Sequence, residues 1–374
     1  MHPWRPVVIG TLVIFAAINL TVLGLGEYFE RLRRTNLMQP ALVASGATSV
    51  PRYDWSTGED QERYWRFIPD ARKTRVVVLD GMSQQYAIND QRSGDRITAE
   101  ILDDTLGTAG LRVFGIAAPN LNNEEFLLHL VSLASRPETA PALLVYGVCF
   151  DKMRNVDARP GIQAMLRTRP DIAASWQQVA DSAAPKYPAL AKKMARTLAD
   201  ARSNELTRLD QRIERRVIGS LEDVLPLVRH RADLRSFLLD RLYLLRNAVF
   251  RIKTSTKRPM LPDRYALNRD ALVAALRLAS RRHIPVLLYV VPLNPRAETP
   301  YVEEEYVAFK QWLERTADEE GARFANLESV VPLESWGLLY GQPDFKHFKE
   351  EGHAATARAL LPLIRSAVGG VGPR

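Results

Sequence analysis

Cysteine is almost absent from this chain. Cys149 is the one cysteine in 374 residues, so no internal disulfide can form and no cysteine-rich zinc site exists. The six histidines include no HExxH motif, and only His347 and His353 lie close enough in sequence to suggest a pair of ligands. We therefore expect no metal site and no cofactor.

Long uncharged stretches are absent as well, with one exception. Residues 7 to 25, VVIGTLVIFAAINLTVLGL, carry no charge, and at ~1.5 Å per residue they extend roughly 28 Å, close to the ~30 Å hydrocarbon layer of a bilayer. Trp4 and Tyr28 flank the stretch, and no small-residue cleavage site follows it. Residues 1–30 are thus expected to form an uncleaved, single-pass signal anchor. The amide of Asn19, in mid-span, either bonds a partner helix or is tolerated.

Negative charge is scarce in one part of the chain. The formal net charge is +8, and residues 186–258 hold 18 Lys and Arg against 8 Asp and Glu. The rest of the chain therefore sums to about −2. This basic block could meet anionic lipid headgroups or an anionic polymer, or it could be an ordinary solvated helical segment. The anchor argues against nucleic acid as a partner.

Beyond a connector at residues 31–70, the pattern of residues 71–374 predicts an α/β domain. Three apolar runs alternate with stretches whose apolar residues recur every three or four positions. The runs are TRVVVLD at 74–80, LRVFGIA at 111–117 and ALLVYGV at 142–148. Such β–α–β–α–β alternation is typical of a parallel sheet covered on both faces.

A helical insertion interrupts this rhythm at about residues 152–265 and carries most of the basic excess. The α/β pattern then resumes with a strand at 285–291, a helix, a short strand in RFANLES at 323–329, and a final helix. The fold class expected is a doubly wound, mostly parallel α/β sheet. In such sheets the active site lies at the carboxyl ends of the strands.

Ser83 follows the first expected strand in TRVVVLDGMSQQYAIND. A helix that begins there would direct free N–H groups at a developing oxyanion, which suits a nucleophile. Serine is also a common helix N-cap, so this segment alone leaves both roles open.

Asp344 and His347 lie three residues apart in PDFKHF, in an expected turn before the final helix. A nucleophilic serine needs a base, and the base needs an acid that orients it. A DxxH turn can supply both, although the two residues could equally be a helix cap and a surface histidine. A serine at a strand end combined with DxxH before the last helix favours the catalytic interpretation.

These motifs resemble those of the SGNH, or GDSL-type, hydrolases. The resemblance covers about residues 71–151 and 268–366 and leaves out the insertion. It implies that Ser83 is the nucleophile, His347 the base and Asp344 the acid.

The resemblance also implies an oxyanion hole, and there the sequence departs from the family pattern. The second-block turn is GIAAPN, in which the backbone N–H of Ala118 would replace that of the usual glycine, beside the N–H of Ser83. The third block reads GVCFD, with Cys149 where the family has an asparagine, so Asn120 is the nearest substitute donor. The usual Gly-Asp-Ser is Gly-Met-Ser, with Asp80 placed earlier.

With a single N-terminal anchor, these departures make the chain most similar to the membrane-anchored DltD-like branch, and more distantly to AlgX/AlgJ-like proteins. That likeness implies transfer of an acyl group to or from an extracytoplasmic polymer or glycan through an acyl-serine. It also implies a multi-pass acyltransferase partner of the MBOAT type. The arginines at 31, 33 and 34 would by themselves place the body in the cytoplasm, whereas the resemblance and the scarcity of cysteine favour the outside.

Three further residues follow expected strands and are candidates for substrate binding: Asp151, Lys152 and Asn294. Each could equally belong to a solvated loop or a cleft wall. Cys149 has no neighbouring base and is expected to be a buried structural cysteine. His353 is expected to lie at the surface or to cap a helix.

Two functions from different classes remain open at this stage. The first is an anchored serine esterase or O-acyltransferase, and a cytoplasm-facing hydrolase is a variant of it. The second is a non-catalytic scaffold that keeps the fold and binds other components of an envelope acylation complex.

Overall fold

The computed structural model describes residues 5–24, 52–54, 75–92, 94–108, 110–135, 140–203, 255–339 and 342–369, with short pieces between 221 and 250. The chain divides into two compact units. The N-terminal unit consists of Met1–Gln39 and Asn204–Thr254. The sheet unit consists of Pro40–Ser203 and Ser255–Arg374.

The sheet unit is built on a six-stranded parallel sheet in the order β1-β3-β2-β4-β5-β6. Its strands are β1 (Arg52–Asp54), β2 (Arg75–Gly81), β3 (Leu111–Ala117), β4 (Leu143–Val148), β5 (Val286–Val290) and β6 (Arg323–Asn326). The mostly parallel α/β sheet expected from the sequence is confirmed, and its five predicted strands are β2 to β6. The short β1 was missed, because it lies in the connector and pairs only with β3.

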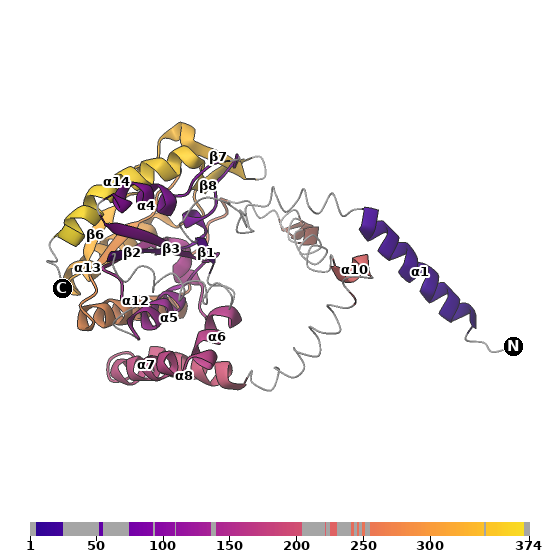
Figure 1. Ribbon diagram of the computed structural model, residues 1–374, viewed down its shortest axis with the longest axis horizontal. Coiled ribbons are helices and arrows are strands. Elements are labelled where there is room, and N and C mark those ends of the chain that lie inside the picture. Colours follow the sequence, from indigo (N-terminus) through magenta and orange to yellow (C-terminus); the bar gives the residue numbers. More distant parts are fainter. Residues whose placement is uncertain are drawn as a thin grey trace. The chain divides into compact units, whose positions relative to one another are not determined.

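Helices cover both faces of the sheet (Figure 1). Side chains of β2 alternate, so that Val77 and Leu79 pack on one face while Val76 and Val78 pack on the other. The first face carries α4 (Thr98–Gly107) and α14 (Glu350–Gly369). The second carries α5 (Asn123–Ala134), α12 (Pro262–Arg281) and α13 (Glu303–Glu319).

The chain changes direction across the sheet at β2. It leaves β2 for β3 on one side and later returns to β4 on the other side. The loops after β2 and its neighbours therefore diverge at the carboxyl edge and leave room for a site. Ser83 lies just beyond this end of β2.

The helical insertion begins within the sheet unit. Its first helices are α6 (Pro160–Thr168), α7 (Pro170–Ala183) and α8 (Pro188–Ser203), which pack on one another and on α5 and α12. The buried Trp176 fixes two of them, since its indole nitrogen donates to the carbonyl of Met194 at 3.0 Å. The helices that cover this face of the sheet, α5, α12 and α13, share one apolar core with the outer layer of α6, α7 and α8.

The N-terminal unit contains α1 (Arg5–Gly24), which packs against α10 (Pro226–Arg229). The side chain of Asn19 joins them: its oxygen accepts from the backbone N–H of Leu227 at 3.0 Å, and its nitrogen donates to the carbonyl of Phe15 at 2.9 Å. Among the described residues, no helix combines the length and the apolar content that crossing a membrane requires.

Two local expectations were wrong. No α-helix begins at Ser83, because residues Ser83–Gln85 form a single 3-10 turn, η2. PDFKHF is not a turn but lies within β8 (Gln342–Phe348), which pairs antiparallel with β7 (Trp336–Leu339). The hairpin is stabilised by Trp336 and Phe348, whose rings pack edge to face at 5.5 Å.

Candidate active site

The turn that carries Ser83 is tight and buried. The backbone N–H of Gln85 donates to the carbonyl of Met82 at 2.9 Å, and that of Ala87 to the carbonyl of Ser83 at 2.8 Å. Gly81, the last residue of β2, lies against the side chain of Gln85, and a Cβ at Gly81 would lie 2.5 Å from the Cγ of Gln85. Glycine is thus required for the turn to fold back over the strand end.

Ser83, His347 and Asp344 form a continuous hydrogen-bonded triad. The Oγ of Ser83 lies 2.9 Å from Nε2 of His347, and Nδ1 of His347 lies 2.9 Å from Oδ2 of Asp344. All three side chains are buried. Segments 264 residues apart in sequence therefore meet in the geometry of a serine nucleophile, its base and an orienting acid.

The surroundings of Asp344 keep it ionised. Burial alone raises the pKa of this carboxyl, but the imidazole of His347 and the backbone N–H groups of Lys346 and His347 lower it by more, so the pKa falls below its usual value. These two N–H groups donate to Oδ1 at 3.0 and 3.1 Å. Because a carboxylate faces Nδ1, that nitrogen carries the ring proton, and Nε2 is left to accept the proton of Ser83.

Gln84 joins the nucleophile turn to the strand that bears the base. Its amide nitrogen donates to the carbonyl of Pro292 at 2.8 Å and to that of Lys346 at 2.7 Å. Asn89 adds a second link, since its backbone N–H donates to the carbonyl of Phe348 at 2.8 Å. Neither residue was identified from the sequence, because no local pattern marks a long-range amide contact.

The side chain of Asn294, a candidate for substrate binding, makes its hydrogen bonds to backbone groups within the protein. Its side-chain nitrogen donates to the carbonyl of Asp344 at 2.9 Å, and its oxygen accepts from the backbone N–H of Arg296 at 2.9 Å. Its own backbone N–H donates to the carbonyl of Phe345 at 2.9 Å. Asn294 is buried and holds the acid-bearing strand against the loop after β5.

Asp151 and Lys152, the other two candidates, differ in exposure. Asp151 pairs with Lys346 at 3.2 Å near the triad strand and remains partly exposed. Lys152 is fully buried, its Nζ donating to the carbonyl of Gly147 at 2.7 Å and lying 4.2 Å from the ring centre of Tyr146. Burial lowers the pKa of Lys152 to about 8. Of the two, Asp151 alone is exposed to solvent.

The expected oxyanion donors are only partly available. The backbone N–H of Ala118 donates to the carbonyl of Gly81 at 3.3 Å, a long contact that ties the second-block turn to the end of β2. Asn120 is exposed and has a positive φ of 50°, which asparagine tolerates in turns.

Cys149 directly follows β4, at the position where an oxyanion-donating asparagine was considered, and its side chain is buried. It is 1% exposed, and its sulfur lies 3.4 Å from the hydroxyl of Tyr301. Burial raises the pKa of the thiol, which disfavours a nucleophilic thiolate. The environment matches a structural cysteine.

His353 is buried, so the surface location considered for it is wrong. The backbone N–H of Thr98, the first residue of α4, donates to its Nδ1 at 3.2 Å, and its Nε2 donates to the carbonyl of Ala87 at 3.2 Å. His353 on α14 therefore caps α4 from another element. The N-cap residue Ile97 has no side chain that could do so.

Asp80 belongs to a second buried pair. Its Oδ2 lies 2.9 Å from Nδ1 of His129 on α5, and neither side chain is exposed. Asp80 alternates with Leu79 on β2 and so faces the α5 layer rather than the triad. The Asp80–His129 pair is a polar contact within the core.

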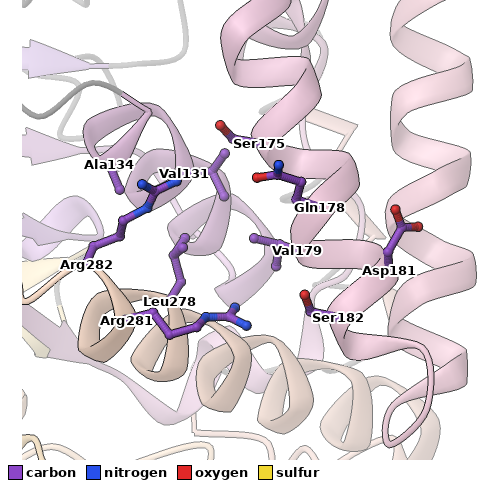
Figure 2. Close-up of a pocket in the computed structure, with 10 residues that line it drawn as sticks. All are labelled: Val131, Ala134, Ser175, Gln178, Val179, Asp181, Ser182, Leu278, Arg281 and Arg282. Carbon is purple, nitrogen blue, oxygen red and sulfur yellow. The ribbon is translucent and has the colours of Figure 1, made fainter.

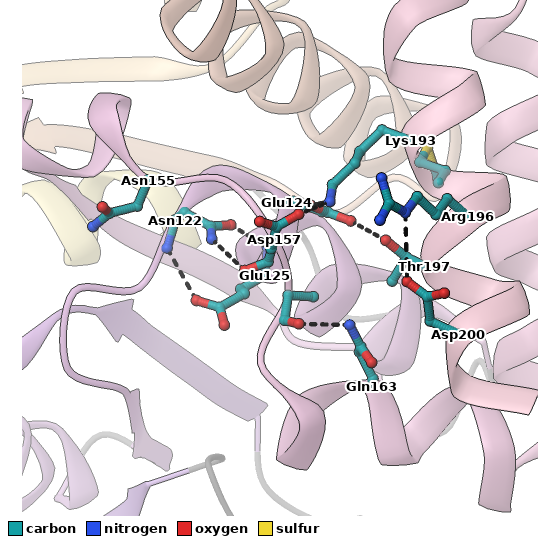
Figure 3. Close-up of polar contacts among 12 residues, drawn as sticks. Asn122, Glu124, Glu125, Asn155, Asp157, Gln163, Lys193, Arg196, Thr197 and Asp200 are labelled. Atoms are coloured by element: carbon teal, nitrogen blue, oxygen red, sulfur yellow. Dashed lines mark hydrogen bonds and ion pairs between the residues drawn. The ribbon is translucent and has the colours of Figure 1, made fainter. Parts of the chain in front are cut away.

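A polar network fixes the start of α5 at the carboxyl edge of the sheet (Figure 3). Asn122 caps α5 by accepting from the backbone N–H of Glu125 at 3.0 Å. Glu125 in turn accepts from Arg159 at 2.7 Å. Thr197 of α8 donates to Glu124 at 2.5 Å, and burial raises the pKa of Glu124. The outer helices are thus fastened beside the second-block turn.

A pocket of about 480 Å³ lies elsewhere, between α5, α7 and α12 (Figure 2). It is lined by Val131 and Ala134 in the last turn of α5 and by Arg281 and Arg282 at the end of α12. Those helix ends lead into the amino ends of β4 and β5, so the pocket lies at the edge opposite Ser83. Its lining contains no histidine and no catalytic pair.

Metal-binding groups were searched for among the residues that the structure describes. These contain no cluster of three or more histidine, cysteine, aspartate or glutamate side chains that could hold an ion.

Comparison with known proteins gives structural neighbours only. No family model matches the chain, and no curated protein is detectably similar in sequence. A proposed acylhydrolase from Bacteroides fragilis shares 13% identity over 85% of this chain and 100% of its own, with a TM-score of 0.40. A GDSL-like lipase from Bacteroides thetaiotaomicron shares 12% identity over 85% and 99%, with a TM-score of 0.37. The solved structures to which this chain is similar therefore include GDSL-like and acylhydrolase proteins, at identities too low to assign it to a family.

Proposed function

We propose that this chain is an SGNH-type serine esterase or O-acyltransferase that works through an acyl-serine on Ser83. The observation that carries the proposal is the hydrogen-bonded series Ser83–His347–Asp344 at 2.9 Å and 2.9 Å, assembled at the switch point of a parallel sheet. A serine within hydrogen-bond reach of an imidazole that is itself oriented by a carboxylate is the geometry that acyl transfer needs.

In the proposed reaction, Nε2 of His347 takes the proton from Ser83 as its oxygen attacks the carbonyl carbon of an acyl donor. The imidazolium that forms is stabilised by Asp344, which stays ionised. His347 then returns the proton to the leaving alcohol, and the acyl-serine remains. Water or a polymer hydroxyl, deprotonated by the same imidazole, attacks the acyl-serine and releases Ser83.

The wider setting is proposed on the sequence resemblance. We infer an N-terminal anchor, a sheet unit outside the cytoplasm, a polymer or glycan acceptor and a multi-pass membrane acyltransferase partner. The uncharged run at 7–25 supports the anchor, and the DltD-like combination of motifs supports the rest.

A non-catalytic scaffold is the second candidate. Cys149 in place of a third-block asparagine, together with the engagement of Ala118 by Gly81, removes two of the usual oxyanion donors. Loss of one such donor costs about 10²–10³ in rate in other enzymes. A slow or partner-dependent enzyme and a scaffold would share this feature.

The deciding experiment exposes the protein to a fluorophosphonate probe and to p-nitrophenyl acetate. Ser83→Ala and His347→Ala should lose both labelling and ester turnover, whereas Ser182→Ala, an exposed serine on α7, should keep them. Peptide mapping should place the label on Ser83. Absence of labelling in folded wild-type protein, alone and with membranes that contain the partner, would favour the scaffold.

A further inference from the structure

The hairpin that carries the acid and the base of the triad is irregular. Its register passes from the pair Trp336–Phe348 directly to the pair Leu338–Pro343. Gly337 is therefore the single residue of β7 that lies opposite four residues of β8, and these four include the acid and the base. Bulges in strand pairs are frequent beside active sites, where they re-aim side chains. The acid is thus set outside the regular ladder, and its orientation depends on contacts with other segments.

One of these contacts comes from the side chain of Asn89. The Oδ2 of Asp344 lies 2.9 Å from Nδ1 of His347, and it also accepts from Nδ2 of Asn89 at 3.4 Å. Asn89 and Asp344 are each 1% exposed, so no bulk water competes for this oxygen. The amide nitrogen has to face the carboxylate, because the amide oxygen in its place would repel the negative charge. Among the described side chains, Asn89 is the one besides the base that donates to the acid.

The position of Asn89 is fixed by its backbone. Its N–H donates to the carbonyl of Phe348 at 2.8 Å. The ring of Phe348 packs edge to face on Trp336 at 5.5 Å and on His353 at 4.7 Å, so this carbonyl belongs to a firmly packed residue. Asn89 also forms a turn with Asp90, which has a positive φ of 52°. The side chain of Asn89 therefore has little freedom to move away from the acid.

Gly337 makes room for this amide. A Cβ at Gly337 would lie 2.1 Å from Cγ, 2.2 Å from Oδ1 and 2.6 Å from Nδ2 of Asn89. These distances are far below the ~3.5 Å of a van der Waals contact, and Asn89 cannot retreat because its backbone is bonded. The φ of Gly337 lies outside the left-handed region, so its backbone conformation does not demand glycine. The close approach of the Asn89 side chain is what demands it.

We propose that Asn89 and Gly337 position the acid of the triad: Gly337 admits the amide of Asn89 to the bulge, and that amide holds Oδ2 of Asp344 toward the base. The inference rests on the proposed function at Ser83. Asn89 touches no reacting atom, so it is a positioning residue and not a catalytic one. It lies six residues after Ser83, and the segment that presents the nucleophile thus also orients the acid.

The test measures hydrolysis of p-nitrophenyl acetate by the full chain. Asn89→Ala should lower kcat about tenfold, the effect of one hydrogen bond to a charged group, and should leave KM within about twofold. The acid limb of the pH profile of kcat/KM should move to higher pH, because a carboxyl with one donor fewer takes up its proton more readily. Asn326→Ala removes an exposed asparagine at the end of β6, so it serves as the control and should change neither value.

Asn89→Asp covers the case in which Asn89→Ala fails to fold. Aspartate keeps the size of the side chain but places a second carboxylate beside Asp344. Above pH 7 this variant should be at least as slow as Asn89→Ala, because like charges repel at this distance.

A double substitution tests whether Gly337 acts through Asn89. Gly337→Ala should lower kcat about tenfold in wild type but less than about twofold in Asn89→Ala, where the space is already free. Gly107→Ala, at a helix end with open space around the added Cβ, is the matched control and should be neutral.

Two results would overturn the proposal. One is an equal loss from Gly337→Ala in both backgrounds. The other is an Asn89→Asp protein with the kcat and the pH profile of wild type. A wild-type protein without turnover or fluorophosphonate label would instead contradict the proposed function at Ser83, and this inference with it. An active wild type with unaffected Asn89 variants would contradict the positioning role alone.

Discussion

His347 acquires its role from three contacts rather than from its own burial. Asp344 hydrogen-bonds to Nδ1, Ser83 hydrogen-bonds to Nε2, and the backbone N–H of His347 donates to Asp344. The acid therefore sets both the position and the tautomer of the ring. A change in the acid should affect catalysis more than stability.

Asp344→Asn tests this dependence on the acid. The amide nitrogen of asparagine would donate toward Nδ1 and favour a proton on Nε2, so His347 could no longer accept from Ser83. We expect ester turnover to fall by about 10⁴, the loss seen when the acid of a serine triad becomes an amide. Asp104→Asn, on the exposed surface of α4, should keep turnover within twofold. Equal losses in both variants would contradict the role of Asp344.

The buried Lys152 makes the stability of the folded protein depend on pH. The unfolded chain keeps this proton up to a pKa near 10.5, whereas in the folded protein burial lowers the pKa to about 8. Between these values the unfolded state binds more protons, so the free energy of unfolding must rise with pH. Below pH 8 Lys152 is charged in the folded protein as well, so the full cost of burying that charge lowers the free energy of unfolding.

Chemical denaturation at several pH values measures the effect. From pH 8 to pH 10.5, wild type should gain about 3 kcal/mol relative to Lys152→Met. Lys192→Met, an exposed lysine on α8, should follow wild type across the range. A difference between wild type and Lys152→Met that does not vary with pH would rule out a lowered pKa.

At the scale of elements, the site depends on how η2 is held against β8. Gln84 makes the direct connection, through one amide nitrogen and two carbonyls from separate segments. Its neighbour in sequence is the nucleophile, so a loss of this contact should alter the distance from Ser83 to His347.

Gln84→Ala is expected to lower stability by about 1–3 kcal/mol, because two buried carbonyls lose their donor. Fluorophosphonate labelling should slow at least tenfold. Gln177→Ala, an exposed residue whose amide contacts Asp181 one turn away, serves as the control and should change neither value. Unchanged labelling in a destabilised Gln84→Ala protein would mean that the triad is positioned by other contacts.

The elements differ in how far the sequence predicts them. Strands β2 to β5 are continuous apolar runs because they are buried on both faces, and that pattern is local. The strand β8 was mistaken for a turn because Pro343, Asp344 and Lys346 resemble turn residues and the strand lacks a continuous apolar run. The nucleophile, base and acid could be proposed from their motifs. The residues that hold them together, Gln84 and Asn89, could not, since their contacts are long-range.

At the scale of the whole molecule, the residues of the triad and their supporting contacts all belong to the sheet unit. The second half of the helical insertion, Asn204–Thr254, belongs to the other unit. The two halves of the insertion are accordingly expected to be separable in function.

Replacement of residues 204–254 by a flexible glycine-serine linker tests that separation. We expect the shortened protein to fold and to label at Ser83 within twofold of wild type, as active-site titration would report. A matched linker inserted after Ser203, with the segment retained, controls for the linker itself. Loss of labelling in a well-folded shortened protein would show that the segment contributes to the site.

The sequence separation of 264 residues between Ser83 and His347 has a consequence for biosynthesis. Chains emerge and begin to fold from the amino end, and contacts between distant segments form late. The strand that bears the nucleophile is complete long before the hairpin that bears its base. A nascent or truncated chain would thus present an unactivated serine, and reactivity would arise only when synthesis of the last hairpin and α14 is finished. The architecture delays assembly of the triad until the protein is whole.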